Sequence, residues 1–366
     1  MSNGIDDYGV SGIVQCEIDI ESGEKLTPSK TIWTGSGGRY LESPHMYKIN
    51  GKYYLVAAEG GTEYGHMVTY ARADSLYGKF EGYENNPVLT NRNLGGYEVQ
   101  GVGHGDLIQD NYGNWWLLHL GFRQSGQWEA YHHLGREVFL TPVIFGEDGW
   151  FTAGDNGRTT KSFEINYINN DVIQKEKKHY TFENTKWDND WCYLRIPNKK
   201  NYKLDKNKLI LKGTDITLDD VDSPTFIGIR QRDFNATISC NVEITDGEAG
   251  ITLYMDENHH YDLAIRKCEN GYEAIERLNI GDIKSVEKSI YLENKNNISL
   301  IINASNSYYS FSIKSENEES ILGYAKTRYL SSEVAGGFTG VVIGLYACAS
   351  NSFNYAEFTN FKCMYK

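Results

Sequence analysis

The chain has 366 residues and a formal net charge of −13, and it carries 27 Tyr, 7 Trp and 14 Phe but only 6 Pro. This length exceeds what one core of ordinary size needs, so we expect two domains. The negative charge disfavours nucleic acids and anionic membrane surfaces as partners, because both would be repelled. A neutral substrate is unaffected by this charge.

Hydropathy, the first residues and the cysteine spacing indicate where the protein resides and which sites it could hold. No stretch approaches the roughly 18 apolar residues of a membrane span. The polar, acidic start from Met1 to Asp7 has no secretion leader, so we expect cytoplasmic residence, provided that Met1 is the true start. Six cysteines without a C-x-x-C pair favour free buried thiols over a zinc site or a disulfide framework. The aromatic residues suit both strands and sugar-stacking clefts.

The first half of the chain reads as short strands joined by turns. An Asn50-Gly51 pair between two apolar runs is a strong hairpin signal. We expect strands at residues 10–20, 30–35, 44–49, 52–59 and 66–73, with a further strand near 86–89.

The same strand, turn, strand, strand order recurs about sixty residues later, at residues 104–109, 115–120 and 136–145. Two similar antiparallel units predict blades of a β-propeller. First strands of blades line the central axis, so Glu42 and His104, which open two such strands, should approach each other. Two blades and a partial one cannot close a ring.

The second half differs in composition. Residues 166–178 are rich in Asn and Lys and are predicted to be a linker. From residue 179 onward, short strands follow one another at intervals of about 8 to 12 residues, which is typical of a β-sandwich. The sequence therefore predicts an all-β chain: a partial propeller of about two and a half blades in residues 1–165, the linker, and a sandwich in 179–366.

Several motifs in the first half carry a family resemblance. They are Glu42-Ser43-Pro44-His45 through Ala58-Glu59-Gly60-Gly61-Thr62, Ala71-Arg72-Ala73-Asp74-Ser75-Leu76-Tyr77-Gly78 with Asn86-Pro87-Val88-Leu89, Gly103-His104-Gly105-Asp106-Leu107 and Leu134-Gly135-Arg136-Glu137. Together they resemble glycoside hydrolase family 43, and within it the β-xylosidases and α-L-arabinofuranosidases with a C-terminal concanavalin-like sandwich. Three later runs resemble the family's sandwich: Ser223-Pro224-Thr225-Phe226, Arg230-Gln231-Arg232 and Gly337-Phe338-Thr339-Gly340.

The resemblance implies a five-bladed propeller that hydrolyses glycosidic bonds with inversion, using a general acid, a general base and an aspartate that orients the acid. It implies that Glu42 is the acid; a carboxylate that caps backbone amides is the alternative. Inversion places acid and base roughly 6.5 to 9.5 Å apart on opposite faces of the sugar. In relatives both aspartates precede the acid, and no acidic residue ahead of Glu42 matches their motifs. We therefore assign no base and expect an N-terminally truncated chain.

Three further residues are implied more broadly. His104 matches a family histidine that contacts substrate or holds a water or calcium ion, with a core histidine as the alternative. Arg136 matches an arginine that reaches the sugar, with an ion pair to Glu137 or another acid as the alternative. Phe338 matches a residue that walls the active site in some relatives, with the sandwich core as the alternative. No cofactor is required on this basis, and a structural calcium ion is the one metal considered.

The expected function is that of the C-terminal portion of an inverting exo-glycosidase acting on terminal xylosyl or arabinofuranosyl residues of xylan-derived oligosaccharides. The general acid is present and the base is missing. The alternatives are a non-catalytic carbohydrate-binding or structural remnant, and one half of a split enzyme that needs an N-terminal partner. Open blade edges present unpaired backbone groups, which favour association with such a half chain or with a second copy.

Overall fold

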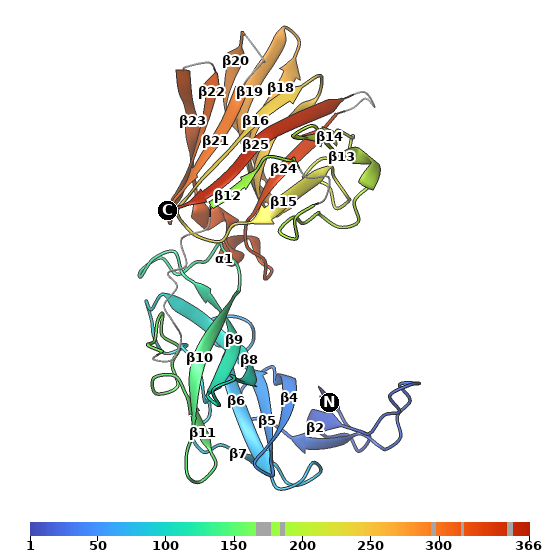
Figure 1. Cartoon of the computed structure of the whole chain (residues 1–366), viewed down its shortest axis with the longest axis vertical. Coiled ribbons are helices and arrows are strands. Elements are labelled where there is room, and N and C mark those ends of the chain that lie inside the picture. Colours follow the sequence, from blue (N-terminus) through green and yellow to red (C-terminus); the bar gives the residue numbers. More distant parts are fainter. Residues whose placement is uncertain (166–176, 184–186, 294–297, 316–317, 350–353) are drawn as a thin grey trace. The chain divides into compact units, whose positions relative to one another are not determined.

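The computed structural model of the chain describes residues 1–165, 177–183, 187–293, 298–315, 318–349 and 354–366 (Figure 1). Its regular secondary structure is almost entirely strand, which confirms the all-β prediction. The helical segments in the described ranges are η1 (Lys199–Asn201), η2 (Thr327–Leu330) and α1 (Ser332–Ala335). No helix in these ranges is long and apolar enough to cross a membrane.

The chain divides into two compact units. Of the described residues, the first unit contains 1–130 and 136–165, and the second contains 131–135 and everything from 177 onward. Most of the predicted linker, 166–176, lies outside the described residues. Its last two residues, Lys177 and Lys178, belong to a strand of the second unit instead.

Three antiparallel sheets form the first unit, and each pairs its strands in chain order. The first sheet contains β1 (Ser2–Ile5), β2 (Ser11–Gln15) and β3 (Lys30–Trp33). The second contains β4 (Glu42–Ile49), β5 (Lys52–Glu59), β6 (Met67–Ala73) and β7 (Glu81–Gly82). The third contains β8 (Val99–Gln109), β9 (Trp115–Arg123), β10 (Glu137–Phe145) and β11 (Phe151–Ala153).

The turn between β4 and β5 follows directly from the sequence. Asn50 and Gly51 have φ angles of 49° and 81°, and Ile49 pairs with Lys52. A two-residue hairpin turn with both residues at positive φ matches the right-handed twist of its strands, and Asn-Gly tolerates it best. The predicted hairpin is confirmed.

The fourth strand of this sheet was predicted at the wrong place. β7 is a two-residue strand at Glu81–Gly82, and residues 88 and 89 instead bond to Val68 at the start of β6. Val88 N donates to Val68 O at 2.9 Å, and Val68 N donates to Leu89 O at 2.8 Å. A strand of two exposed residues is too short to show an alternation of apolar and polar positions. Val88 and Leu89 are apolar and were therefore predicted to form the strand instead.

The second sheet is buried on both faces. Tyr54 and Val56 of β5 belong to a core cluster shared with β8–β11, whereas Leu55 and Ala57 pack into a cluster with Ile13 and Trp33 of the first sheet. Successive residues of a strand point to opposite faces, so one apolar run serves both interfaces. The second sheet therefore packs against the first through one face and against the third through the other.

Two antiparallel sheets form the second unit. One has the order β13 (Tyr202–Asp205), β14 (Lys208–Lys212), β25 (Tyr355–Tyr365), β16 (Ala236–Ile244), β21 (Ile298–Ala304), β22 (Tyr308–Ser315) and β23 (Glu318–Lys326), with β12 (Lys177–Tyr180) also pairing with β25. The other has the order β15 (Phe226–Arg230), β24 (Val342–Cys348), β17 (Glu248–Asp256), β18 (His259–Cys268), β19 (Gly271–Ile280) and β20 (Ile283–Leu292).

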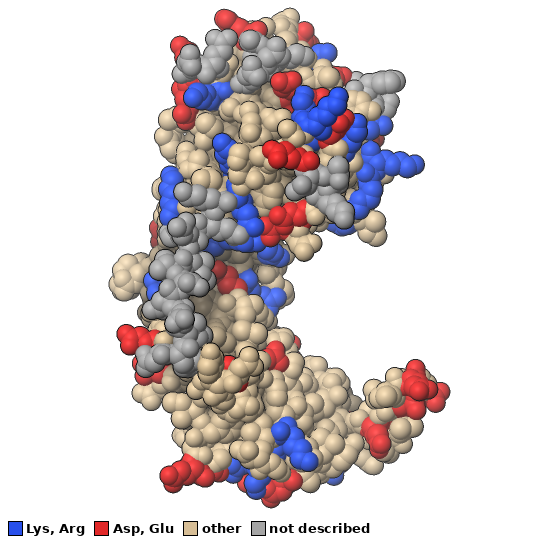
Figure 2. Space-filling model, in the orientation of Figure 1, with Lys and Arg blue, Asp and Glu red and all other residues tan. Residues whose placement is uncertain are grey.

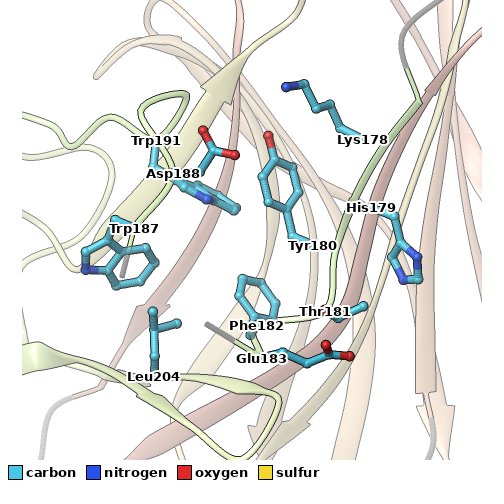
Figure 3. A pocket seen from close by; sticks show the side chains of 10 residues that line it. All are labelled: Lys178, His179, Tyr180, Thr181, Phe182, Glu183, Trp187, Asp188, Trp191 and Leu204. Carbon is cyan, nitrogen blue, oxygen red and sulfur yellow. The ribbon is translucent and has the colours of Figure 1, made fainter. Parts of the chain in front are cut away.

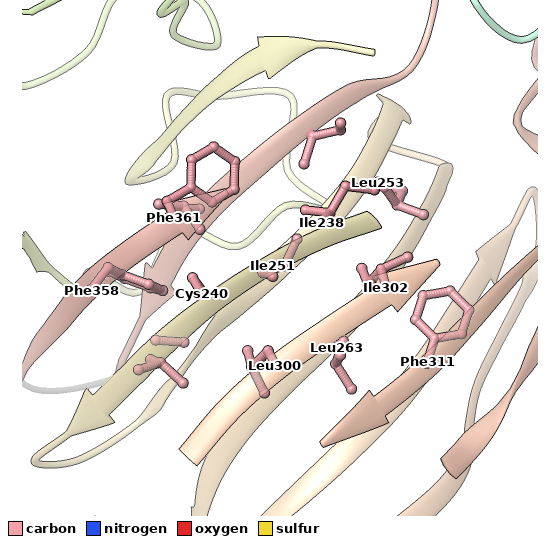
Figure 4. Close-up of a cluster of buried hydrophobic side chains, with 14 of the residues drawn as sticks. Ile238, Cys240, Ile251, Leu253, Leu263, Leu300, Ile302, Phe311, Phe358 and Phe361 are labelled. Carbon is pink, nitrogen blue, oxygen red and sulfur yellow. The ribbon is translucent and has the colours of Figure 1, made fainter. Parts of the chain in front are cut away.

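Alternating strands build the sandwich core (Figure 4). Along β16, Ile238 and Cys240 are buried while their neighbours are partly exposed, and they share one cluster with Ile251 and Leu253 of the opposite sheet. Such alternation is expected where one sheet face meets a core and the other meets solvent. All six cysteines are free, as predicted, but only Cys240 and Cys363 are buried among them.

In the second unit, the sheet that contains β18 carries a buried ionic network on its outer face. His260 Nδ1 bonds to Asp262 and Nε2 bonds to Asp219, each at 2.9 Å, and Arg277 Nε donates to Asp262 at 2.8 Å. Burial alone would lower the pKa of His260, but the two carboxylates outweigh it and raise that pKa to about 9. His260 is therefore charged at neutral pH and ties residue 219 to β18.

This network predicts alkaline destabilisation of the sandwich. A histidine whose folded pKa is raised contributes stability fully below its unfolded pKa, near 6.5, and loses it as pH rises through about 9. The loss is about 3 kcal/mol at roughly 1.4 kcal/mol for each pKa unit. Hydrogen exchange of β18 peptides at pH 6.5 and 9 measures it, and His260→Gln should flatten the pH dependence. His179→Gln, at an exposed position, should not; an unchanged slope in His260→Gln contradicts the assignment.

Candidate active site

Glu42 and His104 lie on the first strands of the second and third sheets. Glu42 opens β4, and His104 lies within β8. Ser43 Oγ and His104 Nδ1 are hydrogen-bonded at 3.1 Å, and the rings of His45 and His104 are 6.4 Å apart. The two first strands therefore meet at these residues, as the sequence predicted.

Both sides of this contact have unusual backbone geometry. Ser43 has φ 52° and His104 has φ 53°, and the pairing of β4 and of β8 with their neighbours shifts register at these positions. Residues other than glycine rarely adopt such angles, and bulges commonly re-aim side chains beside functional sites. Two such residues bonded to each other point to a site that the surrounding sheets hold in place.

The charges around His104 define its protonation state. Burial, followed by the neighbouring His45, lowers the pKa of His104, and Arg136 acts in the same direction. Glu42 and Asp106 act in the opposite direction without cancelling the shift. These groups lie close enough to influence the imidazole, so the structure brings Glu42, His104 and Arg136 together. His104 is neutral at pH 7.

Three more residues at this site were missed by sequence reasoning, although all three lie within the family motifs. His45 Nδ1 bonds to Asp106 Oδ1 at 2.8 Å. Tyr47 donates its hydroxyl hydrogen to Asp106 at 3.0 Å and accepts from Leu107 N at 3.0 Å. These bonds fix β4 against β8 just beside His104. The available signal was the spacing: His45 and Tyr47 stand at alternate positions of β4, and Asp106 stands two residues after His104 in β8.

A buried histidine lies behind the bulge that carries His104. His66 Nδ1 bonds to Gly101 O at 3.1 Å, and burial lowers the pKa of His66 to about 4. A Cβ atom added to Gly103 would lie 2.4 Å from the His66 ring. Neutral His66 therefore packs directly against the backbone of residue 103, which only glycine permits.

Glu59 holds the loop that leads to Glu42. It is fully buried, and its Oε1 accepts from Ser36 N at 2.7 Å and from Thr69 Oγ1 at 2.8 Å. Its Oε2 accepts from Gly38 N at 2.6 Å. Three donors thus share one carboxylate, which fixes residues 36–38 a few positions before the acid. A charge at the end of an apolar strand was the signal for this role.

The sequence left alternative roles open for Glu42, Arg136 and Phe338. The Glu42 side chain is half-buried, and its carboxylate makes no hydrogen bond within the described part of the chain, so it does not cap backbone amides there. The carboxylate of Glu137 is bound by Arg123 Nε and Nη2, each at 2.9 Å. Phe338 belongs to the second unit and is 62% exposed, so the alternative that places it in the sandwich core is wrong, and its role at the sugar stays a prediction.

Arg136 follows a segment that binds within the second unit. Tyr131 and Thr327 hydroxyls are 2.9 Å apart, and the Glu333 carboxylate bonds to His132 Nδ1 at 2.8 Å and to His132 N at 3.0 Å. Val341 N donates to His133 O at 2.9 Å. The chain therefore leaves the second unit one residue before Arg136.

The residues around His104 do not form a set of metal ligands. Calcium takes six to eight oxygen ligands, usually with several carboxylates. Among the described residues, no group of three or more His, Cys, Asp or Glu side chains could hold a metal ion. Asp106 is already engaged by His45 and Tyr47, so no step of the chemistry is derived through a metal.

A separate pocket of about 250 Å³ lies in the second unit (Figure 3). Tyr180, Phe182, Trp187 and Trp191 contribute its rings, and the rings of Tyr180 and Trp191 are 4.7 Å apart. Its wall passes through residues 183 and 187, and the residues between them are outside the described ranges. We assign no ligand to this pocket.

Comparisons with known proteins agree with the fold and the motifs. Residues 1–151 match the family described as glycosyl hydrolases family 43, and residues 179–364 match the β-xylosidase C-terminal concanavalin A-like domain. The non-reducing end α-L-arabinofuranosidase BoGH43B of Bacteroides ovatus is 36% identical over 358 residues, covering 95% of this chain and 67% of that protein. A xylosidase/arabinosidase of Butyrivibrio fibrisolvens is 32% identical over 365 residues, covering 94% and 69%.

A solved structure extends the match to three dimensions. The structure titled Bacteroides ovatus Xyloglucan PUL GH43B superposes with a TM-score of 0.90 at 35% identity, covering 96% of this chain and 71% of that one. Such neighbours combine a propeller with a β-sandwich. This protein belongs to glycoside hydrolase family 43.

The role of Glu59 predicts a stability loss in Glu59→Gln. A glutamine must place an N–H group against one of the three donors, and hydrogen bonds to a buried charged acceptor contribute about 1.5 to 3 kcal/mol each. We expect the free energy of unfolding to fall by about 2 to 4 kcal/mol in urea titrations. Glu21→Gln, at an exposed position, should change it by less than about 0.5 kcal/mol. Equal stabilities of the two variants would contradict this role.

The packing of His66 predicts a local effect of Gly103→Ala. The added methyl group would overlap the His66 ring, and overpacking a core costs about 1 to 3 kcal/mol. Gly95→Ala is the matched control, because nothing lies within 4 Å of its added Cβ. Thermal unfolding measures both. A Gly103→Ala melting temperature equal to that of Gly95→Ala would show that the two groups do not pack as described.

Proposed function

We propose that this protein takes part in the inverting hydrolysis of terminal xylosyl or arabinofuranosyl residues of xylan-derived oligosaccharides, with Glu42 as the general acid. The observation that carries the proposal is the meeting of Glu42, His104 and Arg136 at the first strands of two adjacent sheets. Glu42 is half-buried and makes no hydrogen bond in the described ranges. A carboxyl group in this state can donate its proton to a leaving glycosidic oxygen.

The neighbouring groups have separate tasks in this proposal. Neutral His104 exchanges hydrogen bonds with the sugar while Ser43 holds its Nδ1. Arg136 donates hydrogen bonds to sugar hydroxyls through its planar guanidinium group, which suits paired acceptors. Asp106 keeps the two strands aligned through His45 and Tyr47. The sugar is thereby oriented before the bond breaks, which lowers the entropic part of the barrier.

The carboxylate that activates water is assigned to a segment outside these 366 residues. Within the described ranges, Asp106 is bound by His45 and Tyr47, and Glu59 is fully buried and holds three donors. Neither can activate water on the opposite face of a sugar. About a third of the length of each of the two curated relatives has no counterpart in this chain, and such a segment is the proposed source of the base and of the remaining blades.

The surface and the relatives support a neutral sugar as substrate. On the face that Figure 2 shows, much of the first unit is uncharged, and both acidic and basic side chains lie mainly toward its lower edge. The curated relatives are named for arabinofuranosidase and xylosidase activities, which release neutral pentoses. No cofactor is needed, because acid and base groups suffice for hydrolysis.

The acid role predicts a leaving-group effect in Glu42→Gln. Protonation matters most when the leaving oxygen is strongly basic, and a general acid typically contributes about 10²- to 10⁴-fold. We expect a loss of this size on aryl arabinofuranosides and xylosides of weakly acidic phenols, and a much smaller loss on dinitrophenyl glycosides. Steady-state kinetics with both phenol types measure the difference, and Glu24→Gln, at an exposed position, is the matched control.

The assay is run with this chain alone and mixed with the part of the Bacteroides ovatus relative that the alignment leaves uncovered. Turnover should rise by at least about 10²-fold on mixing, because water activation is restored. Full activity of the chain alone that disappears in Glu42→Gln would contradict an external base. Losses of equal size for both phenol types would contradict the acid role of Glu42.

A further inference from the structure

A second cleft lies at the other margin of the same sheets. It has a volume of about 470 Å³ and lies between β7 and the β10–β11 hairpin. Glu42 and His104 are on the first strands of their sheets, whereas β7 and β11 are the last strands. The cleft is therefore separated from the candidate active site by the width of the sheets. All of its lining residues belong to the first unit and to the described ranges.

An aromatic wall lines this cleft. The rings of Tyr83 and Trp150 are 5.5 Å apart and tilted by 35°, and both side chains are half-buried. The Arg72 guanidinium lies 4.0 Å from the Trp150 ring centre, and its Nη1 donates to Asp148 O at 2.8 Å. Tyr70, fully buried, stacks on Tyr83 at 5.1 Å. The wall is thus fixed from behind and needs little ordering when a ligand arrives.

Polar groups beside this wall are available to a ligand. In the described part of the chain, the side chains of Tyr83, Glu84, Asn85 and Trp150 make no hydrogen bond. They supply a hydroxyl, a carboxylate, an amide and an indole N–H around one hollow. Aromatic faces with a few convergent donors and acceptors suit a sugar ring, which has apolar C–H faces and a rim of hydroxyls.

The charge of the cleft narrows the ligand class. Glu81, Glu84 and Asp148 line it, none of the described residues that line it is Lys or Arg, and the Arg72 guanidinium behind the wall is held by Trp150 and Asp148. Phosphorylated or carboxylated ligands would be repelled, because like charges raise the cost of burial. A neutral ligand that presents hydroxyl donors to carboxylates is favoured instead.

We propose that this cleft is a second, non-catalytic binding site for neutral sugar units of a xylan-type chain. The choice of xylan rests on the proposed function, whereas the cleft itself is independent of Glu42. When the cleft holds one part of a xylan-type chain, the effective concentration of that chain's sugar units at the candidate active site rises, without any new contact at Glu42. Polymers should gain from this site, and single sugars should not.

Affinity electrophoresis in gels that contain soluble arabinoxylan tests the proposal on the full chain. Trp150→Ala should raise the apparent Kd at least about fivefold, because an aromatic contact is lost. Asn85→Ala changes an exposed residue and should raise it about two- to threefold through one lost hydrogen bond. Tyr8→Ala is the matched control, because this aromatic residue is 72% exposed and lies on the β1–β2 turn.

The outcomes separate this site from the proposed function. Glu42→Gln should keep the retardation of the wild type even though it loses turnover. Trp150 also packs against Tyr70, so its variant is checked by thermal unfolding, and Asn85→Ala decides if Trp150→Ala is unfolded. If Asn85→Ala and folded Trp150→Ala are both retarded as strongly as the wild type, the proposal that the cleft binds sugar is wrong, whatever the kinetics of Glu42→Gln. Loss of retardation in the cleft variants, together with no measurable turnover even after mixing with the uncovered part of the Bacteroides ovatus relative, would overturn the proposed function alone.

Discussion

The hydrogen bond between Ser43 and His104 is the contact on which the candidate active site depends. Each residue lies at a register shift with a left-handed backbone, which costs free energy of order 1 to 3 kcal/mol for residues other than glycine. The surrounding sheets must supply that energy. The shared burial of β5 between two core clusters does so, because neither first strand can relax without disturbing a packed interface.

The two units use buried histidines in opposite ways. In the first unit, burial lowers the pKa values of His66 and His119 to about 4, so both side chains are neutral at pH 7. In the sandwich, two carboxylates outweigh burial and keep His260 charged. Neutral His66 and His119 pack inside the first unit without adding charge, whereas charged His260 links the loop at Asp219 to β18. The difference arises from which carboxylates the fold brings within reach.

Local signals made the fold predictable where chain conformation is determined by adjacent residues. Asn50-Gly51 specified a hairpin, and the meeting of the first strands followed from recurring strand order. β7 could not be predicted, because two exposed residues become a strand only through their partner β6. The partners of Glu59 and His66 could not be predicted, since they are backbone groups 21 to 35 positions away in the chain. The exposure of Phe338 depends on a loop whose packing no residue pattern encodes.

The five residues 131–135 have a consequence for dissecting this protein. The chain passes from the first unit to the second, returns, and passes over again, so the units are interleaved rather than joined by one tether. A fragment that ends at residue 165 would keep Tyr131 and His132 but lose Thr327 and Glu333, their partners. Each half made alone would lack these hydrogen-bond partners. Exchanging halves with a relative at a single point in the sequence would therefore not give two units that are each complete.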